Sequence, residues 1–188
     1  MKSNGFLLAF IFTTFLCITC QQKKNDVFPA MDFIKGQIAS VDTPLYSIMK
    51  LVALTDSTYD TTYVKRDDFK NLAKDFLETP DISKEFGGKY TEERMMNNDL
   101  GQAVFIATPN NKNLEVQREE VRIVPGPPDD KVKSIYIEKF SSNNDSAVIK
   151  RMTWYTDKKF QVITITQKKD GEEKTSVMEV IWNKGENE

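Results

Sequence analysis

AVIKRMTWYTDKKFQVITITQ, residues 147–167, is the stretch that decides the fold. Two runs rich in β-branched and aromatic residues, 147–156 and 160–167, flank the short polar turn DKK. Such residues are enriched in strands, and two such runs separated by a few polar residues are typical of a hairpin. Strands joined by a short turn pair as antiparallel neighbours. The stretch therefore predicts an antiparallel unit from which a larger sheet can be built.

The same pattern continues on both sides of this unit. Other β-prone runs end in turn clusters, and they cover residues 102–108, 114–124, 131–140 and 174–182, with a weaker run at 89–96. Together the runs predict an antiparallel meander of about six to eight strands. Several runs carry apolar residues on both faces. One face is therefore expected to meet helices, and the other to line a curved sheet or an open barrel.

One of these strands changes its pattern along its length. The apolar positions of residues 114–124 shift from Leu114 and Val116 to Val121 and Ile123, which have the opposite parity. Side chains alternate strictly between the two faces of a strand, so a change of parity requires an extra residue. The sequence predicts a β-bulge near residues 118–120.

Two helices and a hairpin are expected before the meander. After Pro29, the apolar residues Met31, Ile34, Ile38 and Val41 recur at spacings of three and four, which predicts an amphipathic helix. Residues 66–78 (RDDFKNLAKDFLE) show the same helical spacing.

Residues 46–65, between the two predicted helices, are interpreted as a hairpin. The segment 45–54 also fits a helix. The predicted fold class is therefore α+β, with two N-terminal helices and a hairpin packed on the meander. Residues 28–188 are enough for one domain with a single core.

The N-terminal residues have a different character. Lys2 precedes an uncharged, mostly apolar run from Gly5 to Thr19, which is the layout of a secretory signal peptide. This run is shorter than the roughly 20 apolar residues that a bilayer-spanning helix needs. Residues 1–19 are therefore predicted to be a signal peptide.

Cys17 and Cys20 are the two cysteines of the chain, which has no histidine. A zinc site needs further Cys or His ligands, and a C-x-x-C redox pair needs a folded βαβ context. The stretch LCITCQQKKND (16–26) instead resembles the lipobox of bacterial lipoproteins, with small Thr19 before Cys20 and a polar segment after it. The resemblance implies that Cys20 is diacylated on its sulfur and becomes the N-terminus, with residues 20–27 as a tether. Cys17 is the alternative site.

The chain as a whole resembles the small uncharacterised lipoproteins of Bacteroidota. The resemblance rests on the signal, on PAMDFIKGQ (29–37), on FKNLAKDFLETPDIS (69–83) and on the strand-rich C-terminal half. It implies a lipid anchor in the cell envelope. Because no acidic run follows Cys20, it favours the outer membrane with the domain facing the periplasm. It transfers no catalytic residue.

Three tripeptides resemble the O-glycosylation acceptor of Bacteroidota envelope proteins. They are DST, DTT and DSA, and their acceptor residues are Ser57, Thr61 and Ser146, all in predicted turns.

Composition limits the chemistry that the chain can perform. Without histidine, Ser–His–Asp catalysis and most zinc sites are excluded. The formal net charge of −2 argues against a nucleic-acid partner, which requires a concentrated basic face. No catalytic residue, metal site or cofactor is indicated. The adjacent acidic pairs 92–93, 119–120 and 129–130 are interpreted as solvated surface.

Aromatic residues in the predicted strands form the last candidate set. They are more often part of a core than of a cavity, but they could line a site for an apolar ligand. The residues are Tyr136, Trp154, Tyr155, Phe160 and Trp182.

Three hypotheses on function follow. The first is a membrane-tethered binding or interaction module, not an enzyme, with an unknown envelope partner. The second is a carrier of an apolar small ligand inside a curved sheet. The third is a carboxylate-dependent hydrolase.

Overall fold

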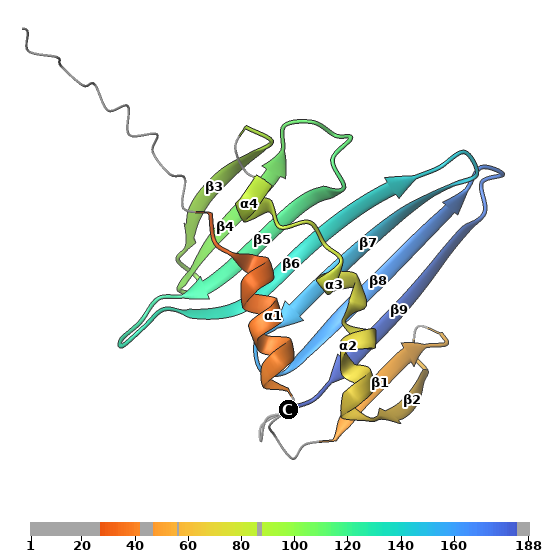
Figure 1. The fold of residues 1–188 in the computed structure, drawn as a ribbon, viewed down its shortest axis with the longest axis horizontal. Helices are drawn as coiled ribbons and strands as arrows, with labels where there is room; N and C mark the ends of the chain where they lie inside the picture. Colours follow the sequence, from red (N-terminus) through yellow and green to blue (C-terminus); the bar gives the residue numbers. More distant parts are fainter. Residues whose placement is uncertain (1–26, 42–46, 56, 86–87, 184–188) are drawn as a thin grey trace, which may run out of the picture.

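The computed structural model describes residues 27–41, 47–55, 57–85 and 88–183, and within them nine strands form one antiparallel sheet. Residues 1–26, with the predicted signal peptide, Cys20 and most of the tether, lie outside the described residues. The strand order is β2-β1-β9-β8-β7-β6-β5-β4-β3 (Figure 1). The strands are β1 (Ile48–Ala53), β2 (Tyr59–Val64), β3 (Tyr90–Asn97), β4 (Gln102–Pro109), β5 (Val116–Val124), β6 (Lys131–Ser142), β7 (Ser146–Tyr155), β8 (Lys159–Lys168) and β9 (Glu173–Ile181).

The predicted meander is confirmed. Strands β3 to β9 are hydrogen-bonded neighbours in chain order, and every pairing is antiparallel. The hairpin β7–β8, which contains residues 147–167, lies near the middle of the sheet. Trp154 lies opposite Phe160, and Met152 lies opposite Val162. Lys158 N–H donates to Tyr155 O across its turn at 3.2 Å, and Asp157 there has a positive φ of 57°. Aspartate is one of the few residues that tolerate this left-handed conformation.

The predicted hairpin also forms, but it extends the sheet and does not pack on it. β1 pairs with β2 through Ile48 opposite Val64, and with β9 through Met49 opposite Ile181. Without β1, the outer backbone N–H and C=O groups of β9 would lack hydrogen-bond partners. Pairing with β1 supplies them. The sheet is open, with β2 and β3 as its edges.

Two β-bulges interrupt the pairing of β5 with β6. The first lies between Val116 and Arg118, close to the predicted position. The second lies where Arg122 pairs with Ser134 and Ile123 pairs with Val132, so that Lys133 has no partner on β5. An extra residue of this kind bends the strand and redirects side chains.

The prediction of two N-terminal helices is not supported. α1 (Ala30–Ser40) is followed, after the hairpin, by a 3₁₀ turn η1 (Arg66–Asp68) and by the four-residue helices α2 (Phe69–Leu72), α3 (Lys74–Leu77) and α4 (Ile82–Glu85). The segment 66–78 is interrupted at Ala73, which has φ −84° and ψ 7°. Phe69 and Phe76 on either side of it are both fully buried. Packing against the twisted sheet outweighs the propensity for one straight helix.

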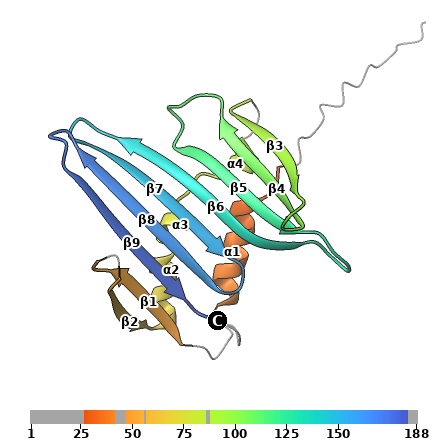
Figure 2. The same ribbon diagram turned by 180° about the vertical axis from the view of Figure 1, so that it is seen from behind.

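The molecule has two layers. α1, α2 and α3 lie on one face of the sheet, and the other face is uncovered by any described element (Figures 1 and 2). The core lies between the helices and the covered face. In the part of the chain that the structure describes, no helix has the length and apolar character needed to cross a membrane.

Candidate functional site

Three of the five candidate aromatic residues lie together in the core. Trp154 stacks on Phe160 with ring centroids 5.3 Å apart and lies 5.1 Å from Trp182. Phe69 reaches Trp182 at 5.2 Å from the helical layer, and Phe76 reaches Trp154 at 5.3 Å. The five rings pack against one another, so Trp154, Phe160 and Trp182 are structural residues of the core.

The other two candidates, Tyr136 and Tyr155, lie on the uncovered face. Each neighbours a buried core residue in its strand, and strand neighbours point to opposite faces. Tyr136 donates its hydroxyl hydrogen to Glu138 Oε2 at 2.9 Å. Burial, this hydrogen bond and the charge of Glu138 raise the pKa of Tyr136 to about 12. The five candidates therefore do not line a common cavity.

A groove of about 480 Å³ on the uncovered face contains both tyrosines. Within it Glu120 accepts hydrogen bonds from Arg118 Nη2 and Arg122 Nε, each at 2.7 Å. Burial favours a higher pKa for Glu120, but the two arginines outweigh it and lower the pKa. The cationic groups of this groove already hold a carboxylate of the protein itself.

The buried state of residues 119–120 corrects their interpretation as solvated surface. Glu119 is only 3% exposed and Glu120 only 7%. Glu119 Oε2 has no hydrogen-bond partner among the described residues. Burial raises the pKa of Glu119 to about 8, with smaller contributions from the negative charges of Asp81 and Glu92. Glu119, Asp81 and Glu92 line neither this groove nor the pocket described next.

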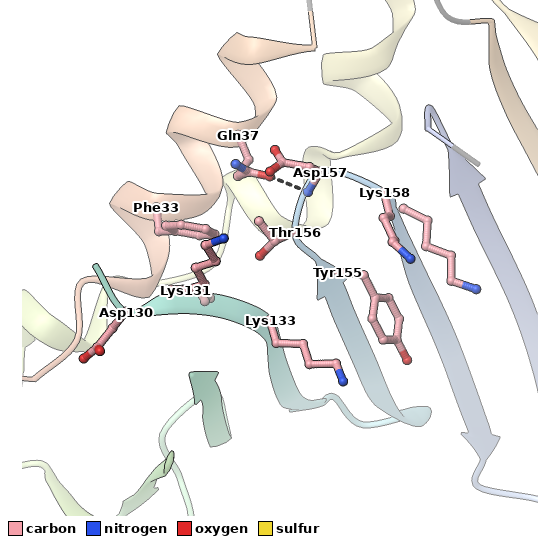
Figure 3. Close-up of a pocket in the computed structure, with 11 residues that line it drawn as sticks. Phe33, Gln37, Asp130, Lys131, Lys133, Tyr155, Thr156, Asp157 and Lys158 are labelled. Carbon is pink, nitrogen blue, oxygen red and sulfur yellow. Dashed lines mark hydrogen bonds between the residues drawn. The ribbon is translucent and has the colours of Figure 1, made fainter. Parts of the chain in front are cut away.

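A second, larger pocket of about 780 Å³ lies between α1, the start of β6 and the β7–β8 turn (Figure 3). We call it the lysine-lined pocket. Its lining residues are Phe33, Gln37, Asp130, Lys131, Val132, Lys133, Tyr155, Thr156, Asp157, Lys158 and Lys159.

Local backbone features build this pocket. The bulge on β6 places Lys133 out of the regular pairing, and Thr156 N–H donates to Lys133 O at 3.2 Å. Asp157 N–H donates to Gln37 Oε1 of α1 at 2.8 Å, which joins the turn to the helix (Figure 3). The bulge, the tight turn and α1 are thus held together around one cavity.

Four lysines and two aspartates give the pocket an excess of positive charge. Lys159 forms an ion pair with Glu179 at 3.3 Å and lies 5.4 Å from the ring centre of Tyr155. Asp130 Oδ1 accepts a hydrogen bond from Gly126 N–H at 3.3 Å. Thr156 Oγ1 is buried and has no hydrogen-bond partner among the described residues. The pocket therefore offers positive charge, which suits an anionic ligand.

Sequence reasoning did not find this pocket. Lys131 and Lys133 are some 25 residues away from Lys158 and Lys159, and each pair follows or belongs to a polar turn, as solvated lysines commonly do. The one available signal was that both lysine pairs flank turns of neighbouring strands.

The structure places the glycosylation candidates at different kinds of position. Ser57 is exposed in the β1–β2 connection, as predicted. The prediction of turns is wrong for the other two, since Thr61 lies within β2 and Ser146 begins β7. Thr61 is exposed on an edge strand, whereas Ser146 Oγ is hydrogen-bonded to Asn143 Oδ1 at 3.3 Å.

Among the described residues, no group of three or more His, Cys, Asp or Glu residues is placed to hold a metal ion. Comparisons with protein-family models, with curated proteins and with solved structures found no match to this chain.

Proposed function

We propose that the protein is a lipoprotein of the bacterial cell envelope that acts as a binding module, with the lysine-lined pocket as its ligand site. The observation that carries the proposal is the excess of lysine over aspartate around this cavity. The anchor is proposed from the lipobox-like sequence at Cys20. The proposed location is the outer membrane, with the domain facing the periplasm.

The size and lining of the pocket support a small or extended acidic ligand. Its volume of about 780 Å³ falls within the range of roughly 300–1,000 Å³ for ligand sites. Phe33 and Tyr155 supply apolar surface at its walls, and the lysines supply charge. A ligand with an anionic group next to an apolar or flat part matches this combination.

The place of the pocket in the chain supports a ligand close to the membrane. Phe33 belongs to the first turn of α1, which begins ten residues after Cys20. Two acyl chains hold a protein stably at a bilayer, because each buried methylene contributes about 0.8 kcal/mol. A module on such an anchor meets its ligands at or near the membrane surface.

Acylation is tested by replacing each cysteine in turn. We expect Cys20→Ser to abolish incorporation of labelled palmitate and to leave the signal peptide uncleaved, whereas Cys17→Ser leaves both unchanged. Intact mass of the membrane-extracted protein measures both effects. Acylation that survives in Cys20→Ser and is lost in Cys17→Ser would contradict the assignment.

Ligand binding is tested by NMR on the acylated protein in nanodiscs of neutral lipid. A panel of small carboxylates and phosphates is titrated, and glycerol is the uncharged control. We expect saturable amide shifts at Lys133, Thr156 and Asp157 with at least one acidic compound. Shifts spread evenly over the surface lysines, or none at these amides, would contradict a binding role for the pocket.

The described residues give less support to the two other hypotheses. The apolar-carrier hypothesis relied on aromatic rings, three of which are buried among neighbouring rings. The hydrolase hypothesis needs carboxyl groups that a substrate can reach, and the carboxyl with the most perturbed pKa, Glu119, is buried.

A further inference from the structure

We infer that the lysine-lined pocket binds a phosphate ester, supplied by the headgroup of an anionic phospholipid or by a soluble phosphate monoester. The inference rests on the proposed function, because it names the ligand class of the same pocket.

The cations of the pocket suit a phosphate ester. All four of its basic residues are lysines, which are compact charges with three rotatable donors. They come from two segments, the start of β6 and the β7–β8 turn. In Figure 3 Lys131 extends toward Phe33 of α1, and Lys133 extends toward Tyr155. A tetrahedral phosphate presents oxygens in several directions and can accept from more than one lysine, which is a common phosphate ligand. The arginines of the nearby groove are already bound to Glu120.

Thr156 also lines the pocket. Its hydroxyl oxygen has almost no exposed surface and is unpartnered among the described residues, and a buried polar group without a partner is costly. Figure 3 shows Thr156 between Gln37 and the lysine side chains. The hydroxyl can donate to a phosphate oxygen only if the Thr156 side chain rotates toward the pocket. Hydrogen bonds to a charged acceptor are the stronger kind.

The two aspartates of the pocket should weaken the binding of an anion, which allows a second test. Asp130 is hydrogen-bonded to the β5–β6 loop, and the Asp157 backbone is bonded to Gln37. Their carboxylates oppose an anion, so removal of the Asp157 charge should strengthen binding. Asparagine suits this test because, like aspartate, it tolerates the positive φ of 57°.

A phospholipid of the anchoring membrane is within reach. The eight residue steps from Cys20 to Phe28 can span at most about 28 Å. The pocket can therefore approach the headgroup layer in which the proposed acyl chains are embedded.

The test uses the acylated protein in nanodiscs of phosphatidylcholine. One arm adds glycerol 1-phosphate from solution, and the other replaces part of the lipid by phosphatidylglycerol. Hydrogen exchange of peptides that contain residues 131–133 and 155–159 reports binding in both arms. We expect protection of these peptides in at least one arm, and the arm that responds identifies the source of the phosphate.

Variants separate a built site from general attraction to anions. Lys131→Gln with Lys133→Gln should weaken the response by roughly tenfold, and Asp157→Asn should strengthen it. The matched control is Lys169→Gln with Lys174→Gln, at the far ends of the strands, which should leave it unchanged. An equal loss in the control pair, or no strengthening in Asp157→Asn, would overturn the inference.

Failure of the inference is distinguishable from failure of the proposed function. If neither phosphate source protects the pocket but a carboxylate such as citrate does, the phosphate assignment is overturned and the binding function stands. If no acidic ligand protects it, both are overturned.

Discussion

Replacement of Glu119 by glutamine should make the protein more stable at neutral and mildly alkaline pH, but not at pH 5. The Glu119 carboxyl lies on β5 opposite Ala107 of β4 and Ile137 of β6, and its Oε2 has no hydrogen-bond partner among the described residues. Burial raises its pKa from 4.5 to about 8, and the charges of Asp81 and Glu92 add to the rise. Glutamine has the same shape and no titrating proton.

The sign and size follow from proton linkage. Between pH 4.5 and about 8, the folded state keeps the Glu119 proton and the unfolded state loses it. The free energy of unfolding therefore falls by about 1.4 kcal/mol for each pH unit in this window. The stabilising contribution is complete below pH 4.5 and lost as the pH rises through 8. Between pH 5.0 and 7.5, the native protein should lose about 3 kcal/mol relative to Glu119→Gln.

Urea unfolding at constant ionic strength measures this difference. Both proteins are unfolded at pH 5.0, 6.0, 7.0 and 7.5, and tryptophan fluorescence reports the transition because Trp154 and Trp182 lie in the core. Glu93→Gln, which changes an exposed glutamate on β3, shows the effect of removing one charge alone. Parallel pH profiles for the native protein and Glu119→Gln would refute the reasoning.

The remaining predictions concern other parts of the fold. Glu120→Gln should have the opposite pH dependence. The lowered pKa of Glu120 stabilises the fold above the ordinary value of 4.5, and this contribution decreases as the pH falls below 4.5. In urea unfolding the variant should therefore lose about 1 kcal/mol at pH 7, and the loss should shrink on acidification. Phe76→Ala should cost about 3–5 kcal/mol because the ring is fully buried, whereas Phe140→Ala, which is 37% exposed, should cost far less in the same assay. In calorimetry, Gly36→Ala should raise the melting temperature, because Gly36 lies in a helix with open space around it, and Gly101→Ala should lower it, because Gly101 has a φ of +60°.

Most of the sheet could be predicted because its signals are local. Each strand from β3 to β9 begins and ends within a few residues of a β-prone run bounded by turn residues. The bulge near Arg118 was visible as a change of parity. These features depend on neighbours in the chain, so they are readable without knowledge of the tertiary contacts.

The interruption of the helical segment at Ala73 could not be read in the same way. The apolar spacing around it is that of one continuous helix, and the side chains of Phe69, Ala73 and Phe76 are indeed buried. The break depends on how this segment meets the twisted sheet. Likewise, the pairing of β1 with β9 joins residues more than a hundred positions apart, and no local pattern specifies it.

The sequence by itself determined the order of the strands from β3 to β9 and the apolar residues of the core, because alternation and spacing are properties of the chain. The tertiary structure alone decided that Glu119 loses its contact with water and that lysines from two turns meet Thr156 and α1 in one pocket. Burial and electrostatic environment depend on which distant segments pack together, and charge in the sequence does not reveal them. The candidate site therefore became visible only in the folded chain.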